Sequence, residues 1–253
     1  KEHGVAAARN AAMCRAQGEF VAFLDADDLW LEEHLQLHLN RLEQCPNLDL
    51  TFSAVRWIDE AGAPIGRPVT RHAGRFSYED LLLEYRPVTA SSWVVRRSAL
   101  SAAGLFDPAL VAGSDHDLCL RVALLRPLNV EGLAPALVHY RRRAGQLTSD
   151  RARKMTAWRQ LVEKHTALTA RATPPLLRRS TANLYRALAA LAFEDAEYAE
   201  ARAHFSSALR LEGLSLFDDR RTWVTATALA ASLLPAALRR PVLGLGRRLM
   251  GGA

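Results

Sequence analysis

The sequence predicts an α/β domain, with a sheet flanked by helices, followed by an all-helical region. Up to about residue 145, apolar runs of strand length alternate with segments whose leucines recur at helical spacing. The run Phe20–Leu24 is typical of a strand that is covered on both faces, and the leucines from Leu31 to Leu42 follow it with the period of a helix. Strand signals disappear after residue 150. The first part therefore has the alternation of strands and helices that is typical of an α/β domain, and the second part has helices alone.

Local signals define each element of the first part. Residues 4–16 are rich in alanine, and Gly18 supplies a stop for that helix. Pro46 ends the leucine helix, and the capping-box pattern Ser77–Asp80 opens another. Residues 59–66 have the composition of a turn or hairpin tip. We therefore expect helices at 4–16, 31–45, 78–85, 98–103 and 117–125, and strands at 20–24, 48–58, 92–95 and 135–141.

The region 151–253 is predicted to contain only helices. Helical patterns cover 151–171 and 176–192. Within 184–212, small and aromatic residues fall where a tetratricopeptide-like hairpin places its packing residues, and one such unit is expected to pack on its neighbours because a solenoid needs about three repeats. Residues 222–238 are almost uncharged, which is compatible with an interfacial helix and equally with a buried core helix.

Composition limits the class of protein. The chain has 253 residues, of which 49% are hydrophobic and 24% charged, so it can bury a core and is neither disordered nor fibrous. Its 3 cysteines show no pairing pattern, which favours reduced thiols and a cytoplasmic location. The net charge of +6 includes the run Arg141–Arg143 and arginines near the C-terminus. No nucleic-acid-binding signature accompanies these arginines, so we do not expect nucleic acid as a partner. The arginines form a solvated basic surface or, as the alternative, residues 222–248 contact the inner face of the plasma membrane peripherally.

Three carboxylates follow the first strand, at Asp25, Asp27 and Asp28. The carboxyl end of a strand in an open α/β sheet is where ligands bind, and extended geometry places Asp25 and Asp27 on the same side. Hard divalent cations such as Mg²⁺ or Mn²⁺ take oxygen ligands of this kind together with substrate phosphates. The alternative is that the aspartates cap the helix that follows.

A second acidic pair, Asp115 and Asp117, precedes another amphipathic helix. Anions are stabilised near a helix N-terminus, so capping explains both residues. In the functional interpretation, one of them projects into a cleft as a general base. For displacement at a sugar carbon by an acceptor hydroxyl, a single base on the face opposite the leaving group gives inversion.

Taken together, these stretches resemble the family 2 glycosyltransferases with a GT-A fold. The resemblance covers about residues 1–150, with the motifs in the order of the family, and it implies a GT-A-like mixed sheet flanked by helices. The matching segments are GVAAARN (4–10), GEFVAFLDADDLW (18–30), FSAVRWID (52–59), VVRRSAL (94–100), GLFDPAL (104–110), SDHDLCLRVA (114–123) and LVHYRRRAGQLTSD (137–150).

The resemblance implies roles for individual residues. Asp27 and Asp28 are the candidate ligands of Mg²⁺ or Mn²⁺, and the choice between them is open. Asp115 takes the place of the catalytic base, although Ser114 stands where relatives carry a glutamate. The positions assigned to the nucleotide-sugar donor are Arg9, Asn10, Asp25, Asp27 and Arg143, the last in place of a histidine of the family.

The implied activity is inverting transfer of a sugar from a nucleotide-diphosphate donor to a glycan, lipid-linked or protein acceptor, with Trp93 and Asp117 as candidates for the acceptor side. In relatives a strand, a helix and a second strand precede the ARN helix. We therefore expect residues 1–150 to form a glycosyltransferase domain without its first βαβ unit, with weak donor binding and an unpaired sheet edge. The alternatives are a catalytically silent fragment whose region 151–253 binds a protein or a membrane, and a nucleotidyltransferase-like enzyme.

Overall fold

The computed structural model describes residues 4–69, 73–143 and 150–213, with a few further positions between 222 and 233, and the side chains of 67–69 are left undescribed. The chain divides into two compact units, Lys1–Ala172 and Thr173–Ala253. The first contains the whole described sheet and the second contains helices, as the sequence predicts.

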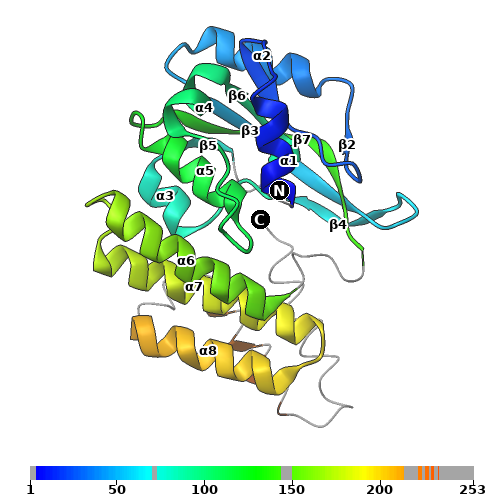
Figure 1. Ribbon diagram of the computed structural model, residues 1–253. Coiled ribbons are helices and arrows are strands. Elements are labelled where there is room, and N and C mark those ends of the chain that lie inside the picture. Colours follow the sequence, from blue (N-terminus) through cyan, green and yellow to red (C-terminus); the bar gives the residue numbers. More distant parts are fainter. Residues whose placement is uncertain are drawn as a thin grey trace. The chain divides into compact units, whose positions relative to one another are not determined.

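The first unit is built on a mixed sheet of 7 strands (Figure 1). The strand order is β1-β6-β3-β7-β2, with β4 paired to β3 and β5 paired to β7. The long strands β3 and β7 run parallel, whereas β6 is antiparallel to both β1 and β3. The strands are β1 (Phe20–Ala22), β2 (Leu29–Trp30), β3 (Leu50–Ile58), β4 (Pro64–Val69), β5 (Gly74–Phe76), β6 (Trp93–Arg96) and β7 (Val130–Arg141).

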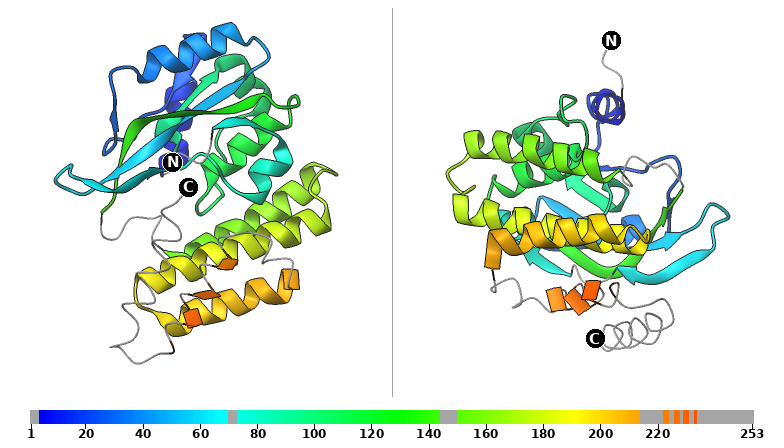
Figure 2. Two further views of the ribbon diagram at one scale, coloured as in Figure 1. Left: turned by 180° about the vertical axis from the view of Figure 1, so that it is seen from behind. Right: turned by 90° about the horizontal axis from the view of Figure 1, so that it is seen from below.

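Helices cover both faces of this sheet, with α2 on the face opposite α1, α4 and α5 (Figure 2). Under α2, Leu42 and Leu48 pack against Val94 of β6. Because neighbouring strand residues point to opposite faces, Trp93 lies on the other side, where its ring contacts Phe23 edge-on. The helices of this unit are α1 (Val5–Met13), α2 (His34–Gln44), α3 (Tyr78–Leu83), α4 (Arg97–Ala103), α5 (Ser114–Ala123) and α6 (Arg151–Leu168), with a 3₁₀ turn η1 at Ala90–Ser92.

The predicted start of the helical region at residue 151 differs from the division that the structure shows. Helix α6 lies within the first unit, which extends to Ala172. Buried Asp117 of α5 accepts hydrogen bonds from Lys164 and from Arg121, and its Oδ1 lies 3.2 Å from Nε2 of His165. A buried carboxylate needs such partners, and two of them come from α6, so α6 packs against the α/β layer.

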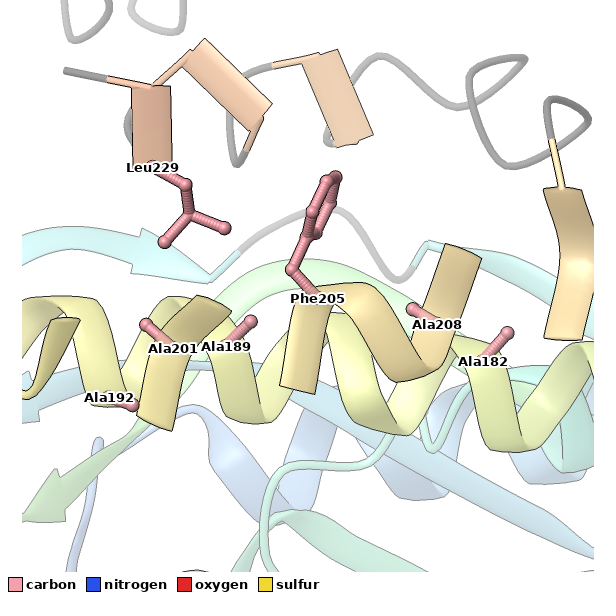
Figure 3. Packing of buried hydrophobic residues seen from close by; sticks show 7 residues of the cluster. All are labelled: Ala182, Ala189, Ala192, Ala201, Phe205, Ala208 and Leu229. Atoms are coloured by element: carbon pink, nitrogen blue, oxygen red, sulfur yellow. The ribbon is translucent and has the colours of Figure 1, made fainter. Parts of the chain in front are cut away.

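The second unit holds a pair of helices, α7 (Pro174–Glu194) and α8 (Tyr198–Glu212). Small side chains at helical spacing let the two helices approach closely, and Phe205 of α8 extends to the side on which Leu229 lies (Figure 3). Thr173 precedes Pro174 and Pro175, which suit the first helical positions because their missing N–H groups would have no intrahelical partner. The alanines of this core are Ala182, Ala189, Ala192, Ala201 and Ala208.

Several expected boundaries differ from the structure. The short strands β2 and β5 carry no periodic signal and were not predicted, and β7 starts at Val130 instead of residue 135. The predicted capping box is present, since Ser77 Oγ accepts from the Asp80 N–H and Asp80 Oδ2 accepts from the Ser77 N–H. Most of the predicted membrane-contacting segment 222–248 lies outside the described residues. Among the helices that are described, none has the length and apolar character needed to span a bilayer.

Helix α2 buries two histidines one turn apart. His34 stacks on Trp30, with ring centroids 4.5 Å apart, and His38 Nδ1 lies 2.8 Å from Thr51 Oγ1. Both ring nitrogens of His34 and Nε2 of His38 are buried without a hydrogen-bond partner in the described part of the chain. Burial lowers the pKa of His34 to about 4, and burial together with the neighbouring His34 lowers the pKa of His38 to about 3.

These histidines predict a loss of stability in mild acid. Their pKa values are lower in the folded state than in the unfolded chain, so the unfolded chain binds more protons as the pH falls from about 6.5 towards 4, and the free energy of unfolding falls by about 1.4 kcal/mol per pH unit for each histidine. His34→Phe keeps the stacked ring and removes one of these protonations. Urea unfolding at pH 7, 6 and 5 should show a shallower pH dependence for the variant, and equal slopes for the two proteins would contradict the assignment.

Candidate active site

The acidic turn begins where β1 ends. Phe23 is buried with its ring edge-on to Trp93 and to Phe106, which anchors the chain just before the carboxylates. The Asp25 N–H then donates to Ser91 Oγ at 3.1 Å, and the Asp28 N–H donates to the Asp25 carbonyl at 3.0 Å. The chain therefore leaves the sheet in a tight turn, and the three aspartates no longer alternate as they would in an extended strand.

Asp28 is the buried member of the three, with 5% of its surface exposed. Ser91 Oγ donates to its Oδ2 at 2.6 Å, and the Arg141 N–H donates to its Oδ1 at 3.0 Å. Burial raises the pKa of Asp28, and these two hydrogen bonds act against that rise. Both carboxylate oxygens face protein donors, so this geometry does not suit Asp28 to the predicted role of metal ligand.

Asp25 and Asp27 are more accessible, and each faces an arginine. Arg9 Nη2 lies 2.5 Å from Asp25 Oδ1, and Arg143 Nε lies 3.9 Å from Asp27 Oδ2. The side chains of Asp25 and Asp27 are 33% and 36% exposed. Asp27 has the looser ion pair, so its carboxylate can exchange its partner for a cation at little cost.

Arg9 and Asn10 have different partners. The Arg9 guanidinium lies over the Phe106 ring, 5.3 Å from its centroid, while it pairs with Asp25. Asn10 instead holds the Phe106 peptide from both sides, because its Nδ2 donates to the carbonyl at 2.8 Å and its Oδ1 accepts from the N–H at 2.9 Å. The geometry gives Asn10 a role in fixing the loop after α4, and it leaves Arg9 as the side chain that faces the acidic turn.

The three consecutive arginines at the end of β7 also differ. Arg141 donates through Nε to the Asp27 carbonyl and through Nη1 to the Asp59 and Glu60 carbonyls, so it ties two turns together. Arg142 lies over the Trp57 ring, 4.7 Å from its centroid. Burial lowers the pKa of Lys154, and the nearby positive charge of Arg142 lowers it further, followed by that of Arg151. Arg141 and Arg143 therefore bring positive charge beside Asp27, while Arg142 acts on Lys154.

Asp115 stands in the first turn of α5 and is half-buried. Tyr85 donates its hydroxyl to Asp115 Oδ2 at 3.0 Å, and the His116 N–H donates to Oδ1 at 2.9 Å. The charge of Arg9 acts on Tyr85 and lowers its pKa, against the larger rise caused by burial and by Asp115. Arg121 of α5 donates to the Leu105 carbonyl, next to Phe106, whose ring contacts Phe23 and lies under Arg9. Helix α5 and the acidic turn therefore adjoin the same loop, although 90 residues separate Asp25 from Asp115.

The structure does not support an acceptor-side role for Asp117 or for Trp93. Side chains two positions apart in a helix point to nearly opposite sides, because each residue turns the helix by about 100°. Asp117 is fully buried and faces the interior, whereas Asp115 points to the other side of α5. Burial alone would raise the pKa of Asp117, but hydrogen bonds from His165, Arg121 and Lys164 outweigh it and place the pKa below its usual range. Trp93 is also fully buried and presents no face to a sugar.

A groove of about 420 Å³ runs between α1 and β1 and ends at the acidic turn. Alanines of α1 and the residues Val21 to Leu24 line most of it, and Arg9 and Asp25 also line it. Strand β1 is the last strand of the described sheet on this side and pairs with β6 alone in the described part of the chain.

Divalent ions need oxygen ligands, so we tested the site for them. Among residues 4–69, 73–143 and 150–213, no three histidine, cysteine, aspartate or glutamate side chains are arranged to hold a metal. Asp27 fits the requirement of Mg²⁺ or Mn²⁺ for a single accessible carboxylate, with substrate phosphates and water as the other ligands. The geometry therefore suits Asp27 to this role in preference to Asp28.

Three residues of this site, Ser91, Arg141 and Tyr85, were not singled out from the sequence. Ser91 and Arg141 hold Asp28, and Tyr85 holds Asp115. Ser91 and Tyr85 carry no local sequence signal of their own. Arg141 belongs to the conspicuous arginine run, but the partner that it binds through its peptide lies 113 residues away.

Comparisons with known proteins place the chain in a family. The family model described as glycosyltransferase like family 2 matches residues 1–171. The amylovoran biosynthesis glycosyltransferase AmsB of Erwinia amylovora is 32% identical over 124 residues, which cover 46% of this chain and 40% of that protein. The putative teichuronic acid biosynthesis glycosyltransferase TuaG of Bacillus subtilis is 35% identical over 80 residues, 31% of each chain.

The solved structure of S. aureus TarS is similar over 95% of this chain and 40% of its own, with 19% identity and a TM-score of 0.48. The chain spans 40% or less of the length of the curated relatives named above. The family model covers well over half of the chain and includes α1, the acidic turn and α5. The chain therefore belongs to glycosyltransferase family 2.

Proposed function

We propose that the α/β unit is the catalytic domain of an inverting glycosyltransferase, which moves a sugar from a nucleotide-diphosphate donor to a glycan, lipid-linked or protein acceptor. The observation that carries this proposal is the presence, in a chain of this family, of two acidic centres: the turn Asp25–Asp28, where Arg9 pairs with Asp25, and Asp115, which Tyr85 holds. One centre is suited to the donor diphosphate and the other to proton removal from an acceptor.

On the donor side, Arg143 and the positive charge of Arg142 and Lys154 face the diphosphate. Guanidinium and ammonium groups donate charge-assisted hydrogen bonds to phosphate oxygens. Arg143 Nε lies 3.9 Å from Asp27 Oδ2. Asp27 would hold a bound Mg²⁺ or Mn²⁺, which neutralises the charge that develops on the departing nucleoside diphosphate.

On the acceptor side, Asp115 removes the proton from the attacking hydroxyl. The acceptor oxygen forms a bond to the anomeric carbon while the bond from that carbon to the phosphate oxygen breaks, and the proton is transferred to the carboxylate. A single base on the face opposite the leaving group gives inversion of configuration. Family membership and the half-buried carboxylate support this role for Asp115, and the full burial of Asp117 argues against Asp117 in its place.

The base assignment predicts the effect of Asp115→Asn in the full-length protein. The amide keeps the shape of the side chain but cannot accept the proton, so kcat/KM should fall by about 10²- to 10⁴-fold. Donor affinity should remain within about twofold, because the donor groups are untouched. Steady-state transfer assays with a panel of UDP- and GDP-sugars measure the first quantity and calorimetry the second. Transfer at the wild-type rate would disprove this role of Asp115.

The donor-site assignment predicts metal-dependent binding that Asp27 controls. Calorimetric titration of the full-length protein with the same UDP- and GDP-sugars should give binding heat with Mn²⁺ and none after chelation with EDTA. Asp27→Asn should weaken the Mn²⁺-dependent affinity by about tenfold or more, which corresponds to the loss of one charged ligand.

Glu60→Gln is the matched control, since it removes an exposed carboxylate from the neighbouring turn that Arg141 holds through main-chain carbonyls. This control should keep wild-type affinity. Donor binding that is independent of metal, or equal affinities for Asp27→Asn and Glu60→Gln, would be inconsistent with the assignment of Asp27.

A further inference from the structure

Tyr85, just after α3, makes the one side-chain hydrogen bond that the described structure gives to Asp115. Its hydroxyl lies 3.0 Å from Oδ2. A second donor, the His116 N–H, binds Oδ1 at 2.9 Å, so the two oxygens of the carboxylate are held from different directions. A carboxylate held by two donors has a defined plane, and a general base needs such a defined orientation towards the proton it removes.

The Tyr85 ring is itself held in place. It lies on the His116 imidazole, with centroids 4.5 Å apart, and the other neighbour of that imidazole is Trp158 of α6 at 6.3 Å. His116 Nε2 lies 3.0 Å from the Leu81 carbonyl, which can only accept, so this nitrogen carries the proton. Burial lowers the pKa of His116 to about 4, so the ring under Tyr85 is neutral near pH 7.

The phenol stays protonated throughout the physiological range. Burial raises the pKa of Tyr85 well above its usual range, and the negative charge of Asp115 adds to this effect. Tyr85 therefore remains a donor to Asp115 at any pH at which the enzyme is active.

We propose that Tyr85 is a positioning residue for transfer: its hydroxyl holds the Asp115 carboxylate in the orientation that faces the acceptor hydroxyl. This inference rests on the proposed function, in which Asp115 is the base. Tyr85 does not touch the reacting atoms, so it acts on the rate through Asp115.

Tyr85→Phe tests the inference in the full-length protein. Loss of the hydrogen bond to a charged group should lower kcat about tenfold and leave the KM for the nucleotide-sugar within about twofold. Because a donor favours the charged form of its acceptor, the acidic limb of the kcat/KM profile should move to higher pH by about one unit. A merely structural role would not move that limb.

Tyr78→Phe is the matched control. Tyr78 is the first residue of α3, the helix that Tyr85 follows; it is fully buried, and its hydroxyl lies 3.2 Å from His165 Nδ1 without contacting Asp115. This variant removes an equivalent buried hydroxyl and should keep the wild-type pH profile. In the Asp115→Asn background, Tyr85→Phe should cause no further loss of rate, because the group through which it acts is already gone.

The outcomes separate this inference from the proposed function. Transfer that survives Asp115→Asn would overturn the base assignment, whereas an inactive Asp115→Asn protein with a wild-type pH profile for Tyr85→Phe would overturn the role of Tyr85 alone. If Tyr85→Phe does not fold, biosynthetic replacement of the tyrosines by 3-fluorotyrosine supplies the second measurement. A more acidic phenol is a stronger donor, so the acidic limb should move to lower pH, and an unmoved limb would contradict the inference.

Discussion

The buried carboxylate of Asp28 is the interaction on which the organisation of the site depends. Removing an ionised carboxylate from water costs several kcal/mol unless donors replace the lost hydration. The donors are the Ser91 hydroxyl, in the middle of η1, and the Arg141 peptide, at the end of β7. Three segments far apart in the sequence must therefore meet at one point. Asp28 organises the turn, and this arrangement leaves Asp25 and Asp27 accessible.

In α5 and in α1, as in the acidic turn, one residue stabilises the fold while a neighbouring residue faces the site. Asp117 binds Arg121, Lys164 and His165 and attaches α6 to the α/β layer, while Asp115, two residues earlier, points elsewhere and is held by Tyr85. Arg9 faces the acidic turn, while its neighbour Asn10 fixes the loop at Phe106. In each motif one residue builds the scaffold and its neighbour is left available for chemistry, because adjacent side chains point in different directions.

Much of this fold could be predicted from the sequence, because apolar periodicity is a local property. The central strand, the leucine helix and the Ser77 capping box were all predicted, whereas β2 and β5 are too short to show a period and exist only through pairing with β7. The candidate aspartates were found by residue type and order. The sequence could not show that Asp28 is buried while Asp25 and Asp27 are accessible, because the partners of Asp28 lie 63 and 113 residues away. Helical spacing alone could have shown that Asp115 and Asp117 face different ways.

The central claim is that Asp28 organises the turn while Asp27 remains available to a divalent ion and the donor diphosphate. A crystal structure of the full-length protein with Mn²⁺ and a nucleoside diphosphate tests it most directly. The account predicts Mn²⁺ on the carboxylate of Asp27 and on phosphate oxygens, with Asp28 still bonded to Ser91 and to the Arg141 peptide. Mn²⁺ coordinated by Asp28, with those two hydrogen bonds broken, would contradict it.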